Sequence, residues 1–247
     1  NLHQPLGLER AGRYHDLMES KFSKPIIDAK NLTRIYALGS SKVIGIDTID
    51  LSIAAGELVI LKGDSGSGKS TLLSLLAGLD RPTRGVLTVA EHDLTTATPA
   101  DLTHFRREVV GMVFQTFNLM PTLNVIENAS LPGLLAGKNP LAVKAKANEL
   151  LEWLGLSRRG HHLPSQLSGG EMQRTAIARA LINDPDIVIA DEPTGNLDSR
   201  NGQVVVDLLA DLNRKWNRTV IIATHSSLAD SLATIHINLK DGVITDG

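Results

Sequence analysis

Two kinds of pattern alternate along this chain: short runs that are apolar throughout, and longer stretches whose apolar residues recur at helical spacing. Residues 58–61 and 187–190 are examples of the first kind, and each run ends in polar residues. Strands that are apolar at every position are typical of a parallel sheet covered by helices on both faces. The pattern therefore predicts an α/β fold with a mainly parallel sheet core. The predicted strands are residues 26–34, 43–53, 58–61, 85–89, 109–114, 187–190, 220–224, 236–239 and 243–245, the last two as a hairpin.

The helices expected between these strands follow from apolar faces and from end signals. Leu72, Leu73 and Leu76 share one helical face, and Gly78 is placed to end that helix. Further helices are expected at about 101–108, 140–154, 168–181 and 204–212. Residues 95–165 are mostly helical, so we expect a helical subdomain of about 95–165 inserted in a domain of residues 25–247. Residues 1–24 show no sustained period and are expected to form an N-terminal tail.

Composition narrows the class of protein. Of the 247 residues, 42% are hydrophobic, which is ample for a core, and the net charge of -2 gives no reason to expect a nucleic-acid partner. The chain has no cysteine, so neither disulfides nor thiol chemistry is expected. No apolar run approaches the ~18 residues of a membrane span. The first residues also lack the apolar core of a signal peptide, so we expect a soluble cytoplasmic protein.

A glycine-rich segment lies between the predicted strand 58–61 and the helix that follows. It matches the pattern G-x-x-x-x-G-K-[ST]. Its backbone N–H groups and the helix N-terminus favour a bound phosphate. Lys69 is expected to contact the β and γ phosphates of a nucleotide, and the Ser70 hydroxyl to ligate Mg2+. A glycine-rich turn that binds nothing would need neither residue. The predicted binding residues are Gly63, Asp64, Ser65, Gly66, Ser67, Gly68, Lys69, Ser70 and Thr71.

Three of the predicted strands end in polar groups, where open α/β sheets bind ligands. These groups are Gln115, the pair Asp191 and Glu192, and His225. Asp191 follows four apolar residues and is expected to hold Mg2+ through water, and Glu192 is the candidate general base. The alternative is an ordinary strand end that enters a Glu-Pro-Thr-Gly turn. The phosphate-binding pattern upstream favours the functional interpretation.

A third motif supplies a family resemblance. Residues 167–174 read Leu-Ser-Gly-Gly-Glu-Met-Gln-Arg and resemble the signature motif of ATP-binding cassette ATPases. The resemblance covers residues 25–247 and implies a P-loop NTPase fold with an antiparallel β subdomain, and ATP and Mg2+ as cofactors. The residues that match the signature are Leu167, Ser168, Gly169, Gly170 and Glu171. Those that match the family's D-loop are Asn196, Leu197 and Asp198.

The resemblance also implies roles for single residues. Tyr36 matches the aromatic residue that stacks on adenine, Gln115 the glutamine loop near Mg2+, and His225 the switch histidine that contacts the γ phosphate. Each has an ordinary alternative: Tyr36 as core, Gln115 as a strand cap, and His225 as a structural histidine. The departures are mild, since Asp64 adds a negative charge to the loop and Ser226 stands where an acidic residue is common.

The family further implies an assembly. The signature helix starts at Ser168 and presents bare N–H groups like a second phosphate loop. Two chains are then expected to pack head to tail, with each ATP between one chain's phosphate loop and its partner's signature. Hydrolysis would open this homodimer.

Residues 191–198 resemble the branch that contains the lipoprotein-releasing and macrolide-export ATPases and the cell-division cassette. The expected function is an ATPase subunit that drives an integral membrane transporter subunit from the cytoplasmic face of the inner or plasma membrane. The alternative is a divisome-type or other non-transport ATPase. A contact surface for the membrane partner is expected just after Gln115, at Phe117, Leu119, Met120 and Leu123, although these side chains could instead pack under the helical insertion.

Overall fold

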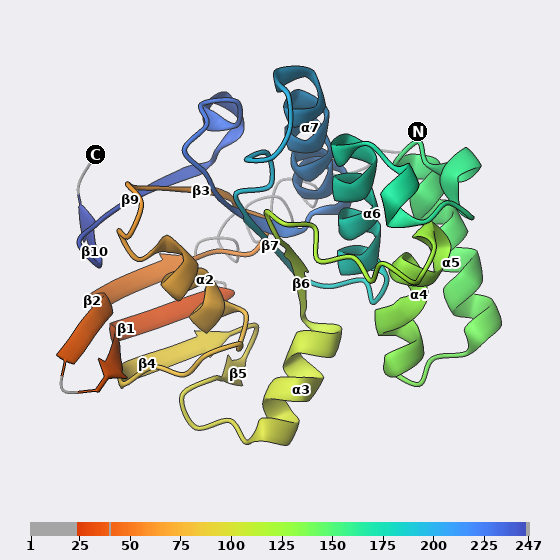
Figure 1. The fold of residues 1–247 in the computed structure, drawn as a ribbon. Helices are drawn as coiled ribbons and strands as arrows, with labels where there is room; N and C mark the ends of the chain where they lie inside the picture. The colour runs from red at the N-terminus through yellow and green to blue at the C-terminus, as the bar shows by residue number, and fades with distance from the viewer. Residues whose placement is uncertain (1–23, 40, 246–247) are drawn as a thin grey trace, which may run out of the picture.

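The computed structural model describes residues 24–39 and 41–245. Apart from Lys24, the predicted tail of residues 1–24 lies outside the described residues. The described chain folds into a core of two sheets and a helical lobe beside it (Figure 1). In this part of the chain, none of the helices combines the length and the apolar content needed to cross a bilayer.

A six-stranded sheet, counted over the described residues, forms the centre of the core. Its strand order is β10-β9-β3-β8-β7-β6, and neighbours are parallel except β10, which forms the predicted hairpin with β9. Its strands are β3 (Leu58–Lys62), β6 (Val110–Val113), β7 (Ile187–Asp191), β8 (Thr219–Ala223), β9 (Ile235–Lys240) and β10 (Val243–Thr245). The mainly parallel core predicted from the sequence is therefore confirmed.

The parallel strands are apolar throughout because both of their faces are buried. In β3, Val59 and Leu61 join an apolar cluster with helix α2 (Lys69–Leu76). Leu58 and Ile60 alternate with them and join a second cluster with helix α7 (Ser199–Trp216) on the opposite face. The same strand thus contributes to two cores.

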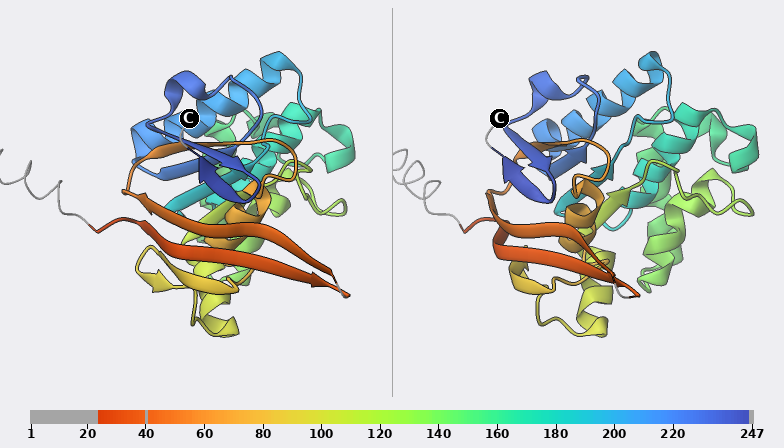
Figure 2. Two further views of the ribbon diagram at one scale, coloured as in Figure 1. Left: turned by 90° about the vertical axis from the view of Figure 1, so that its left-hand side faces the viewer. Right: turned by 60° about the vertical axis from the view of Figure 1, so that its left-hand side comes forward.

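A second sheet is antiparallel and four-stranded within the described residues. Its order is β2-β1-β4-β5, and it packs on α2 from the side opposite the central sheet, so that α2 lies between two sheets (Figure 2). The strands are β1 (Ile27–Leu38), β2 (Ser41–Ile53), β4 (Arg84–Val89) and β5 (His92–Asp93). This sheet is the expected antiparallel β subdomain.

Three helices form the helical lobe: α4 (Val125–Leu135), α5 (Pro140–Trp153) and α6 (Gly169–Leu181). Side chains cap all three at their first turns, from Asn124, Asn139 and Ser168 respectively. The 3-10 turns η1 (Ser157–Arg159) and η2 (Pro164–Gln166) connect α5 to α6, and a third, η3 (Asp230–Leu232), precedes β9.

The lobe begins later than the predicted boundary near residue 95. Helix α3 (Pro99–Glu108) packs through Leu102 and Phe105 into the same apolar cluster as α2, and β6 pairs in parallel with β7 in the central sheet. Residues 99–113 therefore belong to the core, because their apolar side chains are buried there. The helical segment inserted in the core starts after β6.

The chain's two tryptophans connect the lobe to the core. Trp153 ends α5 and Trp216 ends α7, and their ring centroids lie 4.8 Å apart. The ammonium of Lys146 lies 6.0 Å from the Trp216 ring centroid, at the limit of a cation–π contact.

Candidate active site

The phosphate-binding pattern occupies the turn between β3 and α2. Lys69 is the first residue of α2, and its side chain folds back so that Nζ donates to the carbonyl oxygens of Gly63 at 2.6 Å and Asp64 at 3.1 Å. Gly68 has a φ of 105°, and a Cβ there would collide with the Gly45 carbonyl. Only glycine fits this position, so the loop backbone can approach β2 closely.

A pocket of about 370 Å3 opens above this turn. It brings together most of the residues that the sequence singled out, although they come from β1, the loop and the ends of β6, β7 and β8. Gly63 and Asp64 lie beneath it, where their carbonyls hold Lys69. The predicted residues that line the pocket are Tyr36, Ser65, Gly66, Ser67, Gly68, Lys69, Ser70, Thr71, Gln115, Asp191, Glu192 and His225.

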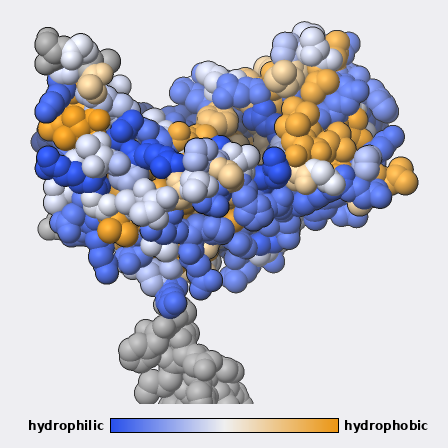
Figure 3. Space-filling view, turned by 90° about the horizontal axis from the view of Figure 1, so that it is seen from below, coloured by the Kyte–Doolittle hydropathy of each residue, from blue (hydrophilic) through white to orange (hydrophobic). Residues whose placement is uncertain are grey.

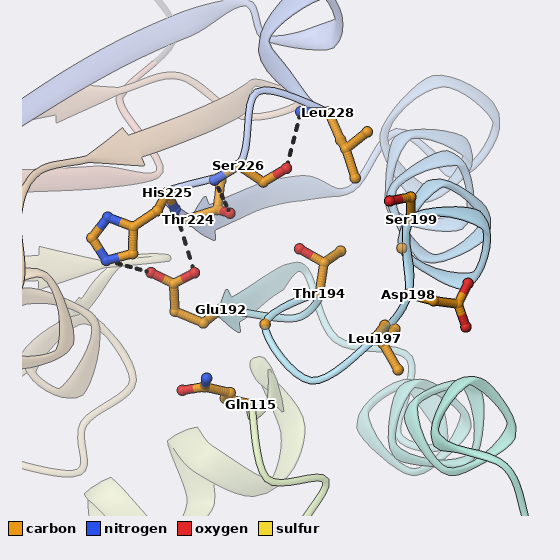
Figure 4. A pocket seen from close by; sticks show the side chains of 12 residues that line it. Gln115, Glu192, Thr194, Leu197, Asp198, Ser199, Thr224, His225, Ser226 and Leu228 are labelled. Atoms are coloured by element: carbon orange, nitrogen blue, oxygen red, sulfur yellow. Dashed lines mark hydrogen bonds and ion pairs between the residues drawn. The ribbon is translucent and has the colours of Figure 1, made fainter.

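Glu192, His225 and Lys69 meet at one side of this pocket. His225 Nε2 lies 3.1 Å from Glu192 Oε1 and 3.4 Å from Lys69 Nζ. The backbone of Glu192 has a φ of 46°, in the left-handed region that few side chains adopt. Its N–H donates to the Ala223 carbonyl of β8 at 2.9 Å, which holds the residue in place. Figure 4 shows its carboxylate directed at His225, with Gln115 nearby.

Three oxygen donors line the same pocket: the Ser70 hydroxyl, the Gln115 amide and the Asp191 carboxylate. Mg2+ prefers oxygen ligands and retains waters, so this donor set fits the ion together with nucleotide phosphates. The described residues contain no cluster of three or more His, Cys, Asp or Glu side chains that could hold a metal by themselves. A metal here would depend on the phosphates.

Tyr36 reaches the pocket from β1 and is held by two residues that the sequence did not suggest, Arg34 and Asp80. The Tyr36 hydroxyl donates to Asp80 Oδ2 at 2.9 Å, and the Arg34 guanidinium lies over the ring. Val43 and Ile44 of β2 also line the pocket, and they are 47% and 54% exposed. Two adjacent apolar residues next to a turn were the available signal for them.

The signature residues lie away from this pocket. Ser168 caps α6, and its N–H and hydroxyl donate to Glu171 Oε2 at 2.9 Å and 3.0 Å, which confirms the capping box. Arg159 of η1 donates to Glu171 Oε1 at 2.7 Å. The Ser168 backbone bond lowers the pKa of Glu171 against its partial burial, and Arg159 lowers it further. The pocket lining includes none of the signature residues Leu167, Ser168, Gly169, Gly170 and Glu171, all of which are described.

The D-loop joins the signature to the end of β6. Asn196 Nδ2 donates to the Gln115 carbonyl at 2.9 Å, and Leu197 packs near Gly169. Asp198 caps α7 by accepting from the Asn201 N–H at 2.9 Å. A Cβ on Gly170 would collide with Asn201, so glycine lets the two helices start side by side. A second pocket, of about 580 Å3, runs from Leu197 and Asp198 to His225 (Figure 4).

The fold and this site define a P-loop NTPase of the ATP-binding cassette class. Residues 46–195 match the ABC transporter family. The chain belongs to this family and is an ATPase of it.

Its relatives include members of the branch suggested by the sequence. The chain is 46% identical to an uncharacterized ABC transporter ATP-binding protein of Mycobacterium tuberculosis, over 89% of this chain and 88% of that protein. It is 39% identical to the lipoprotein-releasing system ATP-binding protein LolD of Treponema pallidum, over 88% of this chain and 96% of that protein. It is 44% identical to the macrolide export ATP-binding/permease protein MacB of Rhodopseudomonas palustris, over 88% of this chain and 33% of that protein.

A solved structure agrees with the fold. The dimeric, post-hydrolysis state of the ATP-binding cassette MJ0796 bound to ADP and Pi superposes with a TM-score of 0.83 and 38% identity, over 89% of this chain and 97% of that one. The relatives LolD and MacB confirm the resemblance to the lipoprotein-release and macrolide-export branch.

Proposed function

We propose that this chain is the ATP-binding and ATP-hydrolysing subunit of a transporter for export or lipoprotein release, and that it drives a separate transmembrane partner. The observation that carries the proposal is the pocket that joins the phosphate loop to Asp191, Glu192 and His225. It provides an anion cradle, oxygen donors and a carboxylate at one place. The names of the relatives LolD and MacB support transport over a purely signalling role.

In this proposal the loop N–H groups and Lys69 bind the β and γ phosphates. Ser70, Gln115 and Asp191 would hold Mg2+, with Asp191 acting through water. When bound, the ion would supply positive charge next to the phosphates. Tyr36 stacks on the adenine beside the exposed Val43 and Ile44 of β2.

Glu192 accepts the proton of the attacking water, and His225 contacts the γ phosphate. In the structure these two side chains are 3.1 Å apart, so His225 can orient the carboxylate of Glu192 and also contact the γ phosphate. The contact between the His225 ring and Glu192 would be exchanged for contacts with the γ phosphate and the water.

The proposal includes a homodimer around two Mg-ATP. The N-terminus of α6, with Gly169 and Gly170, is built like an anion site but lies outside the chain's own phosphate pocket. A second copy packed head to tail would place this helix end over the first copy's nucleotide. The dimeric state of the cassette MJ0796 supports this arrangement.

The membrane partner would dock beneath the molecule, on a groove of about 240 Å3 between α3, β6, α4 and α6. The groove has an apolar floor that includes Met112 and Phe114. Its rim carries three arginines that pair with no carboxylate among the described residues: Arg106, Arg107 and Arg179. A short helix with an apolar face and an acidic residue complements this groove.

The expected contact residues after Gln115 do not line this groove; their neighbours Phe114 and Asn118 do. Phe117, Leu119 and Leu123 are half-buried, and Arg179 donates to the Phe117 and Asn118 carbonyls, which holds this segment against α6. Met120 alone of the four is exposed, at 48%. Leu134, Leu135 and Leu141 of the helical lobe are exposed as well. Seen from below, the lobe carries a patch of apolar side chains (Figure 3). Docking of the membrane partner on this side of the molecule would place the chain at the cytoplasmic face of the inner or plasma membrane.

Glu192→Gln tests the proposal. The amide keeps the shape of the side chain but cannot take a proton, so ATP turnover should fall about 10²–10⁴-fold while ATP still binds. The retained ATP should hold two chains together, which gel filtration with and without ATP would detect. Unchanged turnover would contradict the role of Glu192, and a monomer in saturating ATP would contradict the shared site.

A further inference from the structure

Arg34 and Asp80 form a polar cluster with Tyr36, next to the part of the pocket where the adenine is proposed to bind. This cluster fixes the ring of Tyr36. The Tyr36 hydroxyl and Arg34 Nε donate to the same oxygen, Asp80 Oδ2, at 2.9 Å and 2.8 Å. The guanidinium carbon of Arg34 also lies 4.5 Å from the centroid of the Tyr36 ring. A cation on one face and a hydrogen bond at the tip together leave the ring little freedom to rotate.

Asp80 is in turn fixed to the helix that carries the phosphate loop. Its N–H donates to the Ser74 carbonyl in the last turns of α2 at 3.2 Å, and the Arg81 N–H donates to its other carboxylate oxygen at 2.7 Å. Although burial raises the pKa of Asp80, the bonds from Arg81, Tyr36 and Arg34 outweigh it and lower the pKa. The group is therefore a carboxylate at neutral pH.

One short helix thus connects the two ends of the candidate nucleotide site, which are the phosphate loop and Tyr36. Helix α2 has eight residues and begins with Lys69 at the phosphate loop. Asp80 follows its other end and holds Tyr36. Of the three residues in the cluster, Tyr36 alone lines the pocket. Because Arg34 covers one face of its ring, a base can stack only on the opposite face.

We propose that Arg34 and Asp80 are positioning residues for the nucleotide base: they hold the Tyr36 ring at a set distance from the phosphate loop, with α2 as the rigid spacer. This inference rests on the proposed stacking of adenine on Tyr36. The two residues should therefore affect nucleotide affinity and not the chemical step, because neither lines the pocket in which the phosphates and the attacking water would lie.

The test compares ATP hydrolysis by the full chain and by Tyr36→Ala, Asp80→Ala and the double variant. Asp80→Ala should raise KM for ATP about five-fold and leave kcat within about two-fold. Tyr36→Ala should raise KM at least as much, and the double variant should match Tyr36→Ala, because Asp80 has no ring left to position. Inorganic triphosphate, which has no base, should compete equally well in all four proteins. Asp93→Ala, which removes an exposed carboxylate outside the pocket, is the matched control and should leave KM unchanged.

The outcomes separate the two proposals. If Tyr36→Ala leaves KM unchanged, the stacking itself is wrong. If Tyr36→Ala raises KM and Asp80→Ala does not, stacking stands and the positioning role is overturned. An equal loss from Asp80→Ala with or without Tyr36 would show a merely structural effect and also overturn it. Arg34→Met keeps the stem of the side chain but removes the cation. It should raise KM for ATP, as Asp80→Ala does.

Discussion

Among the described residues, the ammonium of Lys69 contacts backbone oxygens and the His225 ring, but no carboxylate. It donates to the carbonyls of Gly63 and Asp64 and lies 3.4 Å from His225 Nε2, and the residue is only 7% exposed. Neutral carbonyls orient the charge without cancelling it, so it remains available to a phosphate that approaches the loop.

Lys69→Ala should therefore abolish most ATP binding and leave the fold intact. We expect affinity to fall by at least about ten-fold, since charge-assisted bonds to phosphate are lost. Equilibrium binding of ATP, with circular dichroism as a check of folding, measures this. Lys215→Ala, which removes a lysine paired with Asp211 on the surface of α7, is the control. Wild-type affinity in folded Lys69→Ala protein would refute the role.

For single residues, the sequence predicts those that belong to a contiguous motif or end a strand. Lys69, Asp191 and His225 were found in this way, and the structure gathers them in one pocket. Arg34 and Asp80 were not, because they are 46 residues apart and meet only through the fold. Val43 lies opposite Tyr36 through the register of β1 with β2, which periodicity cannot give.

The carboxylate of Glu171 stabilises the start of helix α6. Glu171 accepts from Ser168 through one oxygen and from Arg159 through the other. It therefore joins the start of the signature helix to the turn η1. The same bonds lower its pKa.

Glu171→Ala should reduce the free energy of unfolding by about 1 kcal/mol at pH 7. Because the pKa of Glu171 is lowered in the folded state, its contribution is present above its ordinary pKa of 4.5 and is lost as the pH falls through the folded value. Urea unfolding at pH 7 and in steps below pH 5 should show that the difference in unfolding free energy between the two proteins shrinks in acid. Glu171→Gln can keep the capping box, so its unfolding free energy should fall less than that of the alanine variant. A gap that stays constant into acid would contradict the ionic role.

Strands were easier to predict than helices. Continuous apolar runs gave the central strands within a residue or two, since burial on both faces leaves no other pattern. Helix α4 was missed as a separate element because Pro132 lies inside it and Pro121 precedes it. Its capping box, Asn124 with Glu127, was the signal that could have located it.

For the whole molecule, the groove beneath the core and the lobe is the feature that the proposed function needs. Arg107→Glu reverses a charge on its rim. In the proposed docking, this change should prevent co-purification of the chain with the proposed membrane subunit from native membranes. ATP hydrolysis by the isolated chain should stay unchanged. Arg214→Glu makes the same charge change on α7, outside the groove, and should leave co-purification intact. Retention of the membrane subunit by Arg107→Glu would refute docking at this rim.

The arrangement of the elements was only partly predictable. Alternation of strands and helices gave the parallel sheet, but it could not give the strand order or show that α3 and β6 belong to the core. The order follows from crossovers between β3, β8 and β9, which join residues more than 150 positions apart. The antiparallel sheet came from the family resemblance and not from periodicity.

The contact between Trp153 and Trp216 has a practical consequence. Since these are the chain's two tryptophans, its indole emission arises at a single place, where the helical lobe meets the core. Any rotation of the lobe that separates the two rings would change the intensity or colour of that emission. The protein thus carries its own optical reporter of lobe movement, readable in a stopped-flow mixer without an attached dye.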